Sequence, residues 1–270
     1  MESFCLSIIL FWLRHKVINK VVASADLAVS EVGDGSSIAV GGFGLVGVPN
    51  VLIQALLKKG TTGLRIVSNN CGVDGGGLGL LLEAGRINHV TASYIGTNKE
   101  FERQYLSGLI ELELTPQGTL AEKMRSGGAG IPAFYTPAGV GTWVESGELP
   151  TQFDNIGTPL KLSKPREKRI FNGKEFILEE SITTDFAFVR AYIADTLGNC
   201  VFRKSARNFN PNAAMAGRTT IVEAEKIVAA GEIDPDHVHL PGIYVKKVVQ
   251  LTKEEADLKG IEQYTVRERI

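Results

Sequence analysis

The amino-acid sequence predicts an α/β protein built on an open, mostly parallel β-sheet with helices on both faces and an inserted β-hairpin. From residue 38 onward, short apolar runs alternate with segments of helical periodicity, which is typical of consecutive βαβ units. A glycine-rich loop follows the first apolar run, and an Asn-Gly pair separates two alternating segments in the second half. No low-complexity linker divides the chain, so we expect one main domain.

The first half of the chain is predicted to supply the parallel sheet. Pro49 stands where a helix can begin after the first strand, and Gly60 and Gly63 end that helix. The predicted strands of this half are 37–40, 64–67, 89–95 and 110–114. The predicted helices are one that starts at Pro49, then 77–84, 100–106 and 120–125.

The second half is predicted to add the hairpin and to return to the sheet. Asn172-Gly173 lies inside the alternating segment 169–180, and this pair is a strong signal for a two-residue hairpin turn. The further predicted strands are 185–194, 200–203, 219–222 and 243–249. We assign residues 20–250 to the main domain, residues 1–19 to an unassigned N-terminal segment and candidate presequence, and residues 251–270 to a polar, linker-like tail.

Composition and charge exclude several classes of partner. The formal net charge is −1, so no global field attracts nucleic acid or an anionic membrane. The apolar run 4–13 is shorter than the roughly 20 residues that a membrane span needs, and the basic, acid-poor residues after it are compatible with organelle import. Three widely separated cysteines show neither a metal spacing nor a disulfide framework. We therefore expect no metal, no membrane and no nucleic acid.

The glycine loop Gly42-Phe43-Gly44-Leu45-Val46-Gly47 has the spelling of a dinucleotide-binding fingerprint. A nicotinamide site also needs an acidic residue about 20 positions further on, at the end of the second strand. Asn69 and Asn70 occupy that place, which disfavours the nicotinamide interpretation. Two interpretations stay open: the glycines only turn the chain tightly, or the bare backbone of Gly42, Phe43 and Gly44 approaches a ligand at a helix N-terminus.

Neutral amides follow two of the predicted strands. Asn69 and Asn70 come after strand 64–67, and Gln117 comes after strand 110–114. In an open parallel sheet the carboxyl ends of the strands bind ligands. Such amides can be turn formers only, or they can donate hydrogen bonds to a carboxylate or an acyl oxygen. Together with the glycine loop they predict a neutral, donor-rich pocket suited to oxyanion chemistry.

Other constellations carry weaker signals. Cys71 has no histidine near it in sequence that could activate a thiolate. His237 and His239 share a face of a predicted strand, but they have only acids nearby. The basic segment 203–210 contains Lys204, Arg207 and Asn208, which would suit either a phosphate-bearing ligand or the acids of a partner domain.

Several motifs resemble one known family. Asp34-Gly35-x-x-Ile38-Ala39-Val40-Gly41-Gly42-Phe43-x-x-x-Gly47-x-Pro49 is similar to the signature of the family I coenzyme A transferases. The further matching stretches are 68–70, 100–108, 114–122, 127–137 and 202–210. Together they resemble the A-type half of the members that use succinyl-CoA and 3-ketoacids, from about residue 20 to residue 249.

The resemblance implies a fold, a reaction and site residues. It implies a CoA-transferase-like fold and a ping-pong mechanism in which a glutamate carboxylate captures the acyl group covalently. Matching residue by residue, Gln117 is the expected oxyanion donor, and Asn69 and Asn70 face the carboxylate substrate. The remaining implied contacts are to substrate from Gly42, Phe43 and Gly44, and to CoA or a partner from Lys204, Arg207 and Asn208. No permanently bound cofactor is implied, since the coenzyme A thioester is a substrate.

One motif of the family is absent from this sequence, and its absence indicates which partner the chain needs. The nucleophilic glutamate of the family belongs to a Ser-Glu-Asn-Gly block in the B-type half, and this sequence contains no such block. The chain ends in what resembles the linker before that half, so we expect one protein of a heteromeric enzyme or part of a fused enzyme, inactive alone. The expected assembly is a dimer or heterotetramer with a B-type half, in the mitochondrial matrix or, for a bacterial protein, in the cytoplasm.

Two other functions are compatible with this type of fold. The first is a non-catalytic sensor domain that binds a small molecule. The second is an isomerase, which would need its own acid and base, with Asp185 and Lys204 as the candidates.

Overall fold

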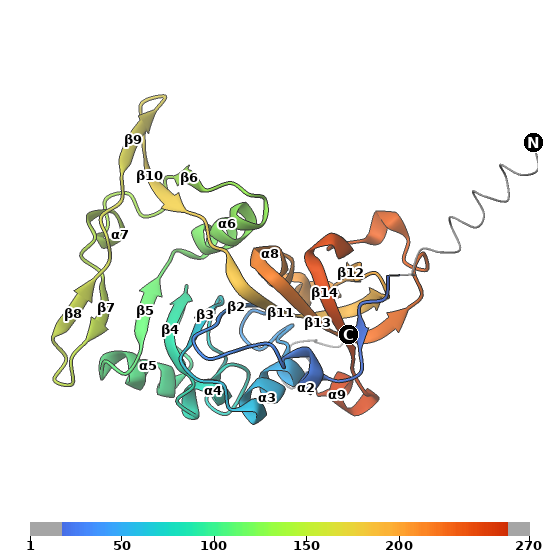
Figure 1. Cartoon of the computed structure of the whole chain (residues 1–270). Coiled ribbons are helices and arrows are strands. Elements are labelled where there is room, and N and C mark those ends of the chain that lie inside the picture. The colour runs from blue at the N-terminus through green and yellow to red at the C-terminus, as the bar shows by residue number, and fades with distance from the viewer. Residues whose placement is uncertain (1–17, 259–270) are drawn as a thin grey trace, which may run out of the picture.

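A computed structural model describes residues 18–258 (Figure 1). Within them, one sheet of nine strands forms the centre of the molecule. Its order is β1 (Val21–Val22), β14 (Val245–Gln250), β13 (Gly217–Val228), β11 (Thr184–Asp195), β2 (Ser37–Val40), β3 (Leu64–Val67), β4 (Ile87–Ala92) and β5 (Glu111–Leu114), with β12 (Cys200–Val201) beside β11. Every pairing is parallel except that of β12 with β11. The predicted open, mostly parallel sheet is confirmed.

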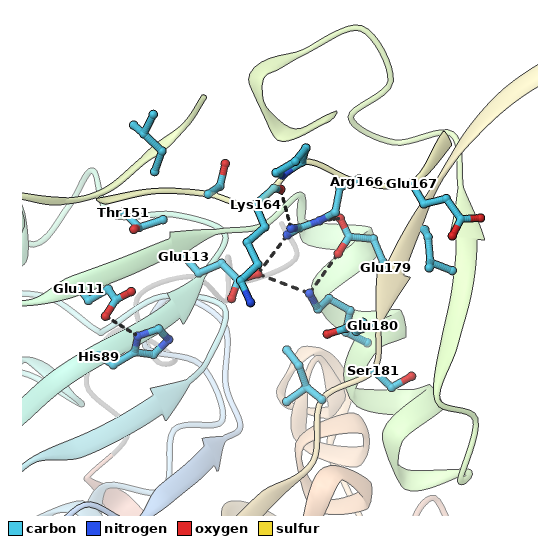
Figure 2. A pocket seen from close by; sticks show the side chains of 16 residues that line it. His89, Glu111, Glu113, Thr151, Lys164, Arg166, Glu167, Glu179, Glu180 and Ser181 are labelled. Carbon is cyan, nitrogen blue, oxygen red and sulfur yellow. Dashed lines mark hydrogen bonds and ion pairs between the residues drawn. The ribbon is translucent and has the colours of Figure 1, made fainter. Parts of the chain in front are cut away.

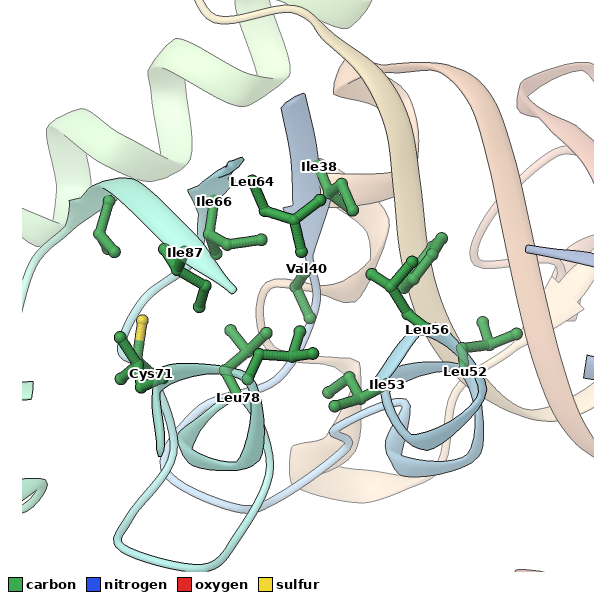
Figure 3. Close-up of a cluster of buried hydrophobic side chains, with 14 of the residues drawn as sticks. Ile38, Val40, Leu52, Ile53, Leu56, Leu64, Ile66, Cys71, Leu78 and Ile87 are labelled. Carbon is green, nitrogen blue, oxygen red and sulfur yellow. The ribbon is translucent and has the colours of Figure 1, made fainter. Parts of the chain in front are cut away.

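Helices cover both faces of the sheet, as predicted (Figure 1). One face carries α2 (Ala25–Ala28), α3 (Asn50–Lys59), α4 (Gly79–Glu83) and α5 (Lys99–Leu106), and the other carries α6 (Gln117–Gly128) and α8 (Asn210–Ala216). Successive strand residues point to opposite faces. Ile38 and Val40 therefore pack into the cluster beneath α3 and α4 (Figure 3), whereas Ala39 packs with α6 and α8.

The order of the strands reverses once. The chain runs outward from β2 through β3 and β4 to β5, and then crosses back to β11 on the other side of β2. From β11 it continues outward in the opposite direction to β13 and β14. At such a reversal the loops that leave neighbouring strands diverge to opposite faces and open a crevice at the carboxyl edge. The glycine loop after β2 lies at this point.

An antiparallel extension, residues 133–180 and here called the arm, projects from the β5 side of the sheet (Figure 1). It contains β6 (Ala133–Thr136), α7 (Trp143–Ser146), β7 (Pro150–Phe153), β8 (Pro159–Leu162), β9 (Lys168–Phe171) and β10 (Lys174–Glu180). β9 and β10 form the predicted hairpin. Its turn residues Asn172 and Gly173 have φ values of 49° and 74°, as a type I′ turn requires. The sequence did not predict β6, α7 or the second hairpin of β7 and β8.

A buried ion pair joins the sheet to α3 and to a short helix that contains Ala256. Glu223 on β13 accepts hydrogen bonds from the N–H groups of Val51 and Leu52 in the first turn of α3, both at 3.0 Å. Arg190 on β11 lies 3.6 Å from the other carboxylate oxygen of Glu223 and also donates to the carbonyl of Ala256 at 3.0 Å. Burial raises the pKa of Glu223 to about 7.

Several other elements differ from the prediction. α9 (Lys253–Asp257) lies inside the segment expected as a linker and begins with a capping box formed by Thr252 and Glu255. The predicted strand 200–203 is only the short β12, and the short 3-10 helix η1 (Lys204–Arg207) begins after two intervening residues. Residues 1–17, the bulk of the candidate presequence, lie outside the described part. No helix between residues 18 and 258 is long and apolar enough to cross a bilayer.

Candidate active site

The predicted site residues gather at the carboxyl edge of the sheet. Gly42, Phe43 and Gly44 follow β2, Asn69 and Asn70 follow β3, and Gln117 follows β5 as the first residue of α6. Because the strands are parallel, their carboxyl ends meet at one edge. Phe43 and Gln117 are exposed there, and the two asparagines are buried.

The structure brings Gln117 and Asn69 into direct contact. The Gln117 amide donates to the side-chain oxygen of Asn69 at 2.7 Å, and the hydroxyl of Ser93 donates to the same oxygen at 2.8 Å. An amide carries two N–H donors, so this bond leaves the second donor of the exposed Gln117 for a ligand. Sequence reasoning missed Ser93, which follows β4 just as Asn69 follows β3. That repetition of polar residues after strands was the available signal.

Asn70 connects two glycine turns. Its side-chain oxygen accepts from the Gly44 N–H at 3.0 Å, and its amide donates to the carbonyls of Gly44 and Gly72 at 3.3 and 3.4 Å. The first turn is closed by hydrogen bonds between Phe43 and Val46, and an equivalent turn follows β3. These bonds use much of the Asn70 side chain within the protein, which gives it a bracing role for the loops.

Asn210 on α8 holds the glycine loop from the other side. Its amide donates to the carbonyls of Gly47 and Ala206 at 2.9 and 2.8 Å, and its oxygen accepts from the Arg190 N–H at 3.0 Å. A Cβ at Gly41 would lie 2.0 Å from that oxygen, so this position has space for glycine alone. Sequence reasoning missed the role of Asn210, because no local pattern shows that its side chain reaches a loop 163 positions away.

Exposed cations lie beside the same loop. The short helix η1 carries Lys204 and Arg207, both exposed, and Asn208 after it donates to the carbonyl of Val46 at 3.0 Å. Arg203 stacks over the ring of Tyr192 with 5.1 Å between the guanidinium carbon and the ring centroid. Guanidinium and ammonium groups at this position can bind a phosphate group. The structure thus places the predicted basic segment at the edge that carries Gln117.

The carboxyl edge is an open surface in this chain. The hollow beneath the glycine loop holds only about 10 Å³ and is lined by residues of the two glycine turns together with Ser68 and Asn70. A sheet edge with amide donors and little enclosure can bind part of a ligand, and a second protein surface would have to cover the rest.

Three weaker hypotheses can be compared with the positions of these side chains. Cys71 is fully buried and its burial raises the pKa of the thiol, so the hypothesis that it is a nucleophile is wrong. His239 accepts a hydrogen bond from the Phe202 N–H, and residues 18–258 contain no metal-binding group of three or more His, Cys, Asp or Glu side chains. Asp185 lies at the start of β11 and binds Ser37, at the edge opposite Lys204, so these two cannot act as an acid-base pair.

The fold and the edge together define an α/β protein of the type that binds ligands at the carboxyl ends of parallel strands. A family model described as Coenzyme A transferase matches residues 22–251. The chain belongs to the coenzyme A transferase family.

Curated relatives of the chain match it over nearly their full length. It is 54% identical over 250 residues to the A-type component of a probable succinyl-CoA:3-ketoacid coenzyme A transferase of Mycobacterium bovis, covering 93% of this chain and 100% of that protein. It is 53% identical over 249 residues to the A-type component of the succinyl-CoA:3-ketoacid coenzyme A transferase of Helicobacter pylori, covering 92% and 98%. Both relatives are bacterial, so they do not confirm the expected mitochondrial location.

Solved structures support the fold at lower identity. An acyl-CoA transferase from E. coli O157:H7, in a thioester complex with CoA, matches 86% of this chain with a TM-score of 0.73 and 24% identity. The chain spans about half of that enzyme, 47% of its length. Glutaconate coenzyme A-transferase from Acidaminococcus fermentans matches 88% of this chain and 77% of its own, with a TM-score of 0.69 and 20% identity.

Proposed function

We propose that this chain is the A-type half of an enzyme that moves coenzyme A from succinyl-CoA to a 3-oxoacid such as acetoacetate. The observation that carries the proposal is the contact between Gln117 and Asn69 at the carboxyl edge. It presents a fixed, neutral donor where an acyl oxygen can approach, as thioester chemistry requires. The names of the relatives, which are A-type components of succinyl-CoA:3-ketoacid transferases, support the same substrates.

The reaction divides one acyl transfer into covalent steps. A glutamate carboxylate attacks the thioester carbonyl of succinyl-CoA, the C–S bond breaks, and the products are an acyl-glutamyl anhydride and CoA thiolate. The thiolate then attacks the glutamyl carbonyl, which releases succinate and leaves a glutamyl-CoA thioester. Acetoacetate reverses these two steps, leaving as acetoacetyl-CoA. Each attack forms a tetrahedral oxyanion.

The residues of this chain serve that oxyanion and the substrate. The second N–H of Gln117 donates to the oxyanion, while Asn69 and Ser93 hold the Gln117 side chain in place. Asn70 keeps the two glycine turns in register, so that Gly42, Phe43 and Gly44 form the wall beside the carboxylate of the substrate. Lys204, Arg207 and Asn208 contact the phosphates of coenzyme A or the acids of the partner.

A B-type half supplies the glutamate and covers the open edge. It is a separate polypeptide or a further domain of the same one, and the complete enzyme is a dimer or heterotetramer. The relatives named as A-type components support a B-type partner, and their bacterial sources favour the cytoplasmic location over the mitochondrial matrix.

The test is an assay of CoA transfer from succinyl-CoA to acetoacetate, run on the chain alone and on a mixture with a separately made B-type half. We expect activity only in the mixture. Gln117→Ala should lower kcat by about 100-fold or more, the loss expected for one oxyanion donor. The matched control is Gln152→Ala in the arm, whose amide donates to the Gly108 carbonyl at 3.3 Å.

Activity of the chain alone would mean that a glutamate of this chain is the nucleophile and that the proposed division of labour is wrong. A stable complex that binds succinyl-CoA without turnover would support the sensor function instead.

A further inference from the structure

A larger space than the hollow beneath the glycine loop lies elsewhere in the part of the chain that the structure describes. It is a cleft of about 440 Å³ between the arm, α6 and the polar face of β4 and β5 (Figure 2). α6 and α8 cover the central strands on this face, and towards the β5 edge the strands present His89, Glu111 and Glu113 instead of apolar side chains. Charged side chains therefore connect the strands on one side of the cleft with the arm on the other side.

Four side chains form a closed ion-pair cluster in this cleft. The Lys123 ammonium on α6 lies 3.0 Å from Glu179 on β10 and 3.4 Å from Glu113 on β5. Arg166, from the segment between β8 and β9, lies 3.2 Å from Glu179 and 3.4 Å from Glu113. The side chains of Lys123 and Glu179 are only 6% and 1% exposed. Charges this deeply buried hold their partners in narrow geometry, because any separation leaves a desolvated charge.

Two residues of the cluster lie on either side of the proposed oxyanion donor, Gln117, in the sequence. Glu113 precedes Gln117 by four positions and Lys123 follows it by six, so the turn from β5 into α6 is fixed on both sides. Two more bonds connect α6 to the residues that directly follow the arm. The N–H of Ile182 donates to the Lys123 carbonyl at 2.8 Å, and the hydroxyls of Ser126 and Ser181 lie 2.7 Å apart.

We propose that Lys123 and Glu179 are positioning residues for Gln117. Their buried pair makes β5, α6 and the arm one rigid unit, and this unit sets where the Gln117 amide stands relative to Asn69. The inference rests on the proposed function of Gln117. Since a displacement of about 1 Å caused by a distant substitution can lower a rate by about 100-fold, a slightly shifted helix is enough to weaken the oxyanion contact.

The experiment uses the complex of this chain with its B-type half and the double variant Lys123→Met with Glu179→Gln, which removes both charges and leaves Arg166 paired with Glu113. We expect kcat to fall about 10- to 100-fold while the KM for succinyl-CoA changes by less than about twofold. Lys123→Arg, which keeps the cation, should retain kcat within a few-fold. The matched control is Glu122→Gln with Arg125→Met, which removes an exposed pair of 2.6 Å on the same helix and should leave kcat unchanged.

Two further measurements keep the test decisive. If the double variant fails to fold, Glu179→Gln alone replaces it, because it removes the buried carboxylate of the proposed pair and leaves Lys123 paired with Glu113; kcat should then fall by about 3- to 10-fold. Amide hydrogen exchange of residues 117–122 should speed up in the double variant and not in the control pair, which reports the loosened turn without any turnover.

The possible outcomes distinguish the proposed function from the inference about Lys123 and Glu179. If Gln117→Ala lowers kcat and the double variant behaves like the control pair, the inference is wrong and the proposed function stands. A higher KM with an unchanged kcat, or a lower melting temperature with an unchanged kcat, would also overturn the inference, because both describe a merely structural cluster. If Gln117→Ala has no effect on an otherwise active mixture, the proposed role of Gln117 fails and the inference fails with it, while the function of the chain as an A-type half stands.

Discussion

Replacing Asn210 by alanine should destabilise the chain severely, although this residue touches no proposed substrate. Its side chain is fully buried and makes three hydrogen bonds of 2.8 to 3.0 Å to backbone groups of the glycine loop, η1 and β11. A typical hydrogen bond contributes about 1 kcal/mol, and each buried group that loses its partner adds a desolvation penalty. We expect the free energy of unfolding to fall by about 3–5 kcal/mol, a large part of the roughly 5–15 kcal/mol that a protein has.

A second substitution makes this prediction specific to the packing of the loop. In the wild-type chain, Gly41→Ala should cost about 2–4 kcal/mol, because its Cβ would lie 2.0 Å from the Asn210 oxygen and 2.6 Å from the Asn210 Cγ. In the Asn210→Ala background both atoms are absent, and the nearest remaining atom is the Cα of residue 210, at 3.1 Å. The cost of Gly41→Ala should then drop below about 1 kcal/mol, a coupling of about 2 kcal/mol between neighbours.

The assay is urea-induced unfolding of the four chains of this cycle, followed by far-ultraviolet circular dichroism. Asn212→Ala, two positions further along α8, is the matched control, because its amide makes one bond of 3.3 Å at a part-buried site and should cost about 0.5–1 kcal/mol. The reasoning is refuted if Asn210→Ala and Asn212→Ala unfold at the same urea concentration, or if Gly41→Ala is equally costly in both backgrounds.

Three further predictions follow from buried and exposed charges. The pKa of Glu223 rises from 4.5 to about 7 on folding, so the native state keeps a proton that the unfolded state loses. The stability from this group is present below pH 4.5 and falls by up to about 3 kcal/mol as the pH rises to 7; urea titrations at several pH values should show a flatter profile for Glu223→Gln, and identical profiles would contradict the assignment. Cys71 and Cys200 are buried, and burial raises the pKa of both thiols, so a maleimide should label them only after denaturation, as mass spectrometry of tryptic peptides can check; rapid labelling of the native chain would refute the burial. Lys204→Ala with Arg207→Ala should raise the KM for succinyl-CoA by about 10-fold or more and weaken its salt dependence, with no change in the unfolding midpoint; an unchanged KM would assign these cations to another partner.

The parallel sheet was predictable because its strands are buried on both faces. Residues 37–40 and 64–67 are largely apolar or small runs between turn residues, and β2 and β3 have those bounds. The arm was harder, because β8 is exposed along its whole length and a strand that buries no face has no alternating pattern to detect. β9 is also exposed, yet its hairpin was predicted, because Asn172-Gly173 specifies the turn without any burial.

The candidate site likewise contains residues that the sequence could predict and residues that it could not. Gln117 and Asn69 could be proposed because each follows a strand, and parallel strands bring such residues to one edge whatever their separation in sequence. Nothing in the sequence distinguishes Asn70, which braces the loops, from Asn69, which holds Gln117, because the difference lies in the direction of the side chains. The partners of Lys123 were equally hidden, since Glu179 belongs to a segment whose position depends on the whole arm.

The place of β2 in the sheet also has a consequence for synthesis of the chain. β2 lies in the middle of the finished sheet, but its second neighbour, β11, begins about 148 positions later, as the contact between Ser37 and Asp185 shows. At roughly 5–20 residues per second, a ribosome needs roughly 7–30 s to make that interval. Throughout it, β2 is an uncovered edge strand with unpaired backbone groups, the kind of edge that recruits other chains. Holding nascent chains apart, by slow initiation or by chaperones, should therefore improve the yield of this protein.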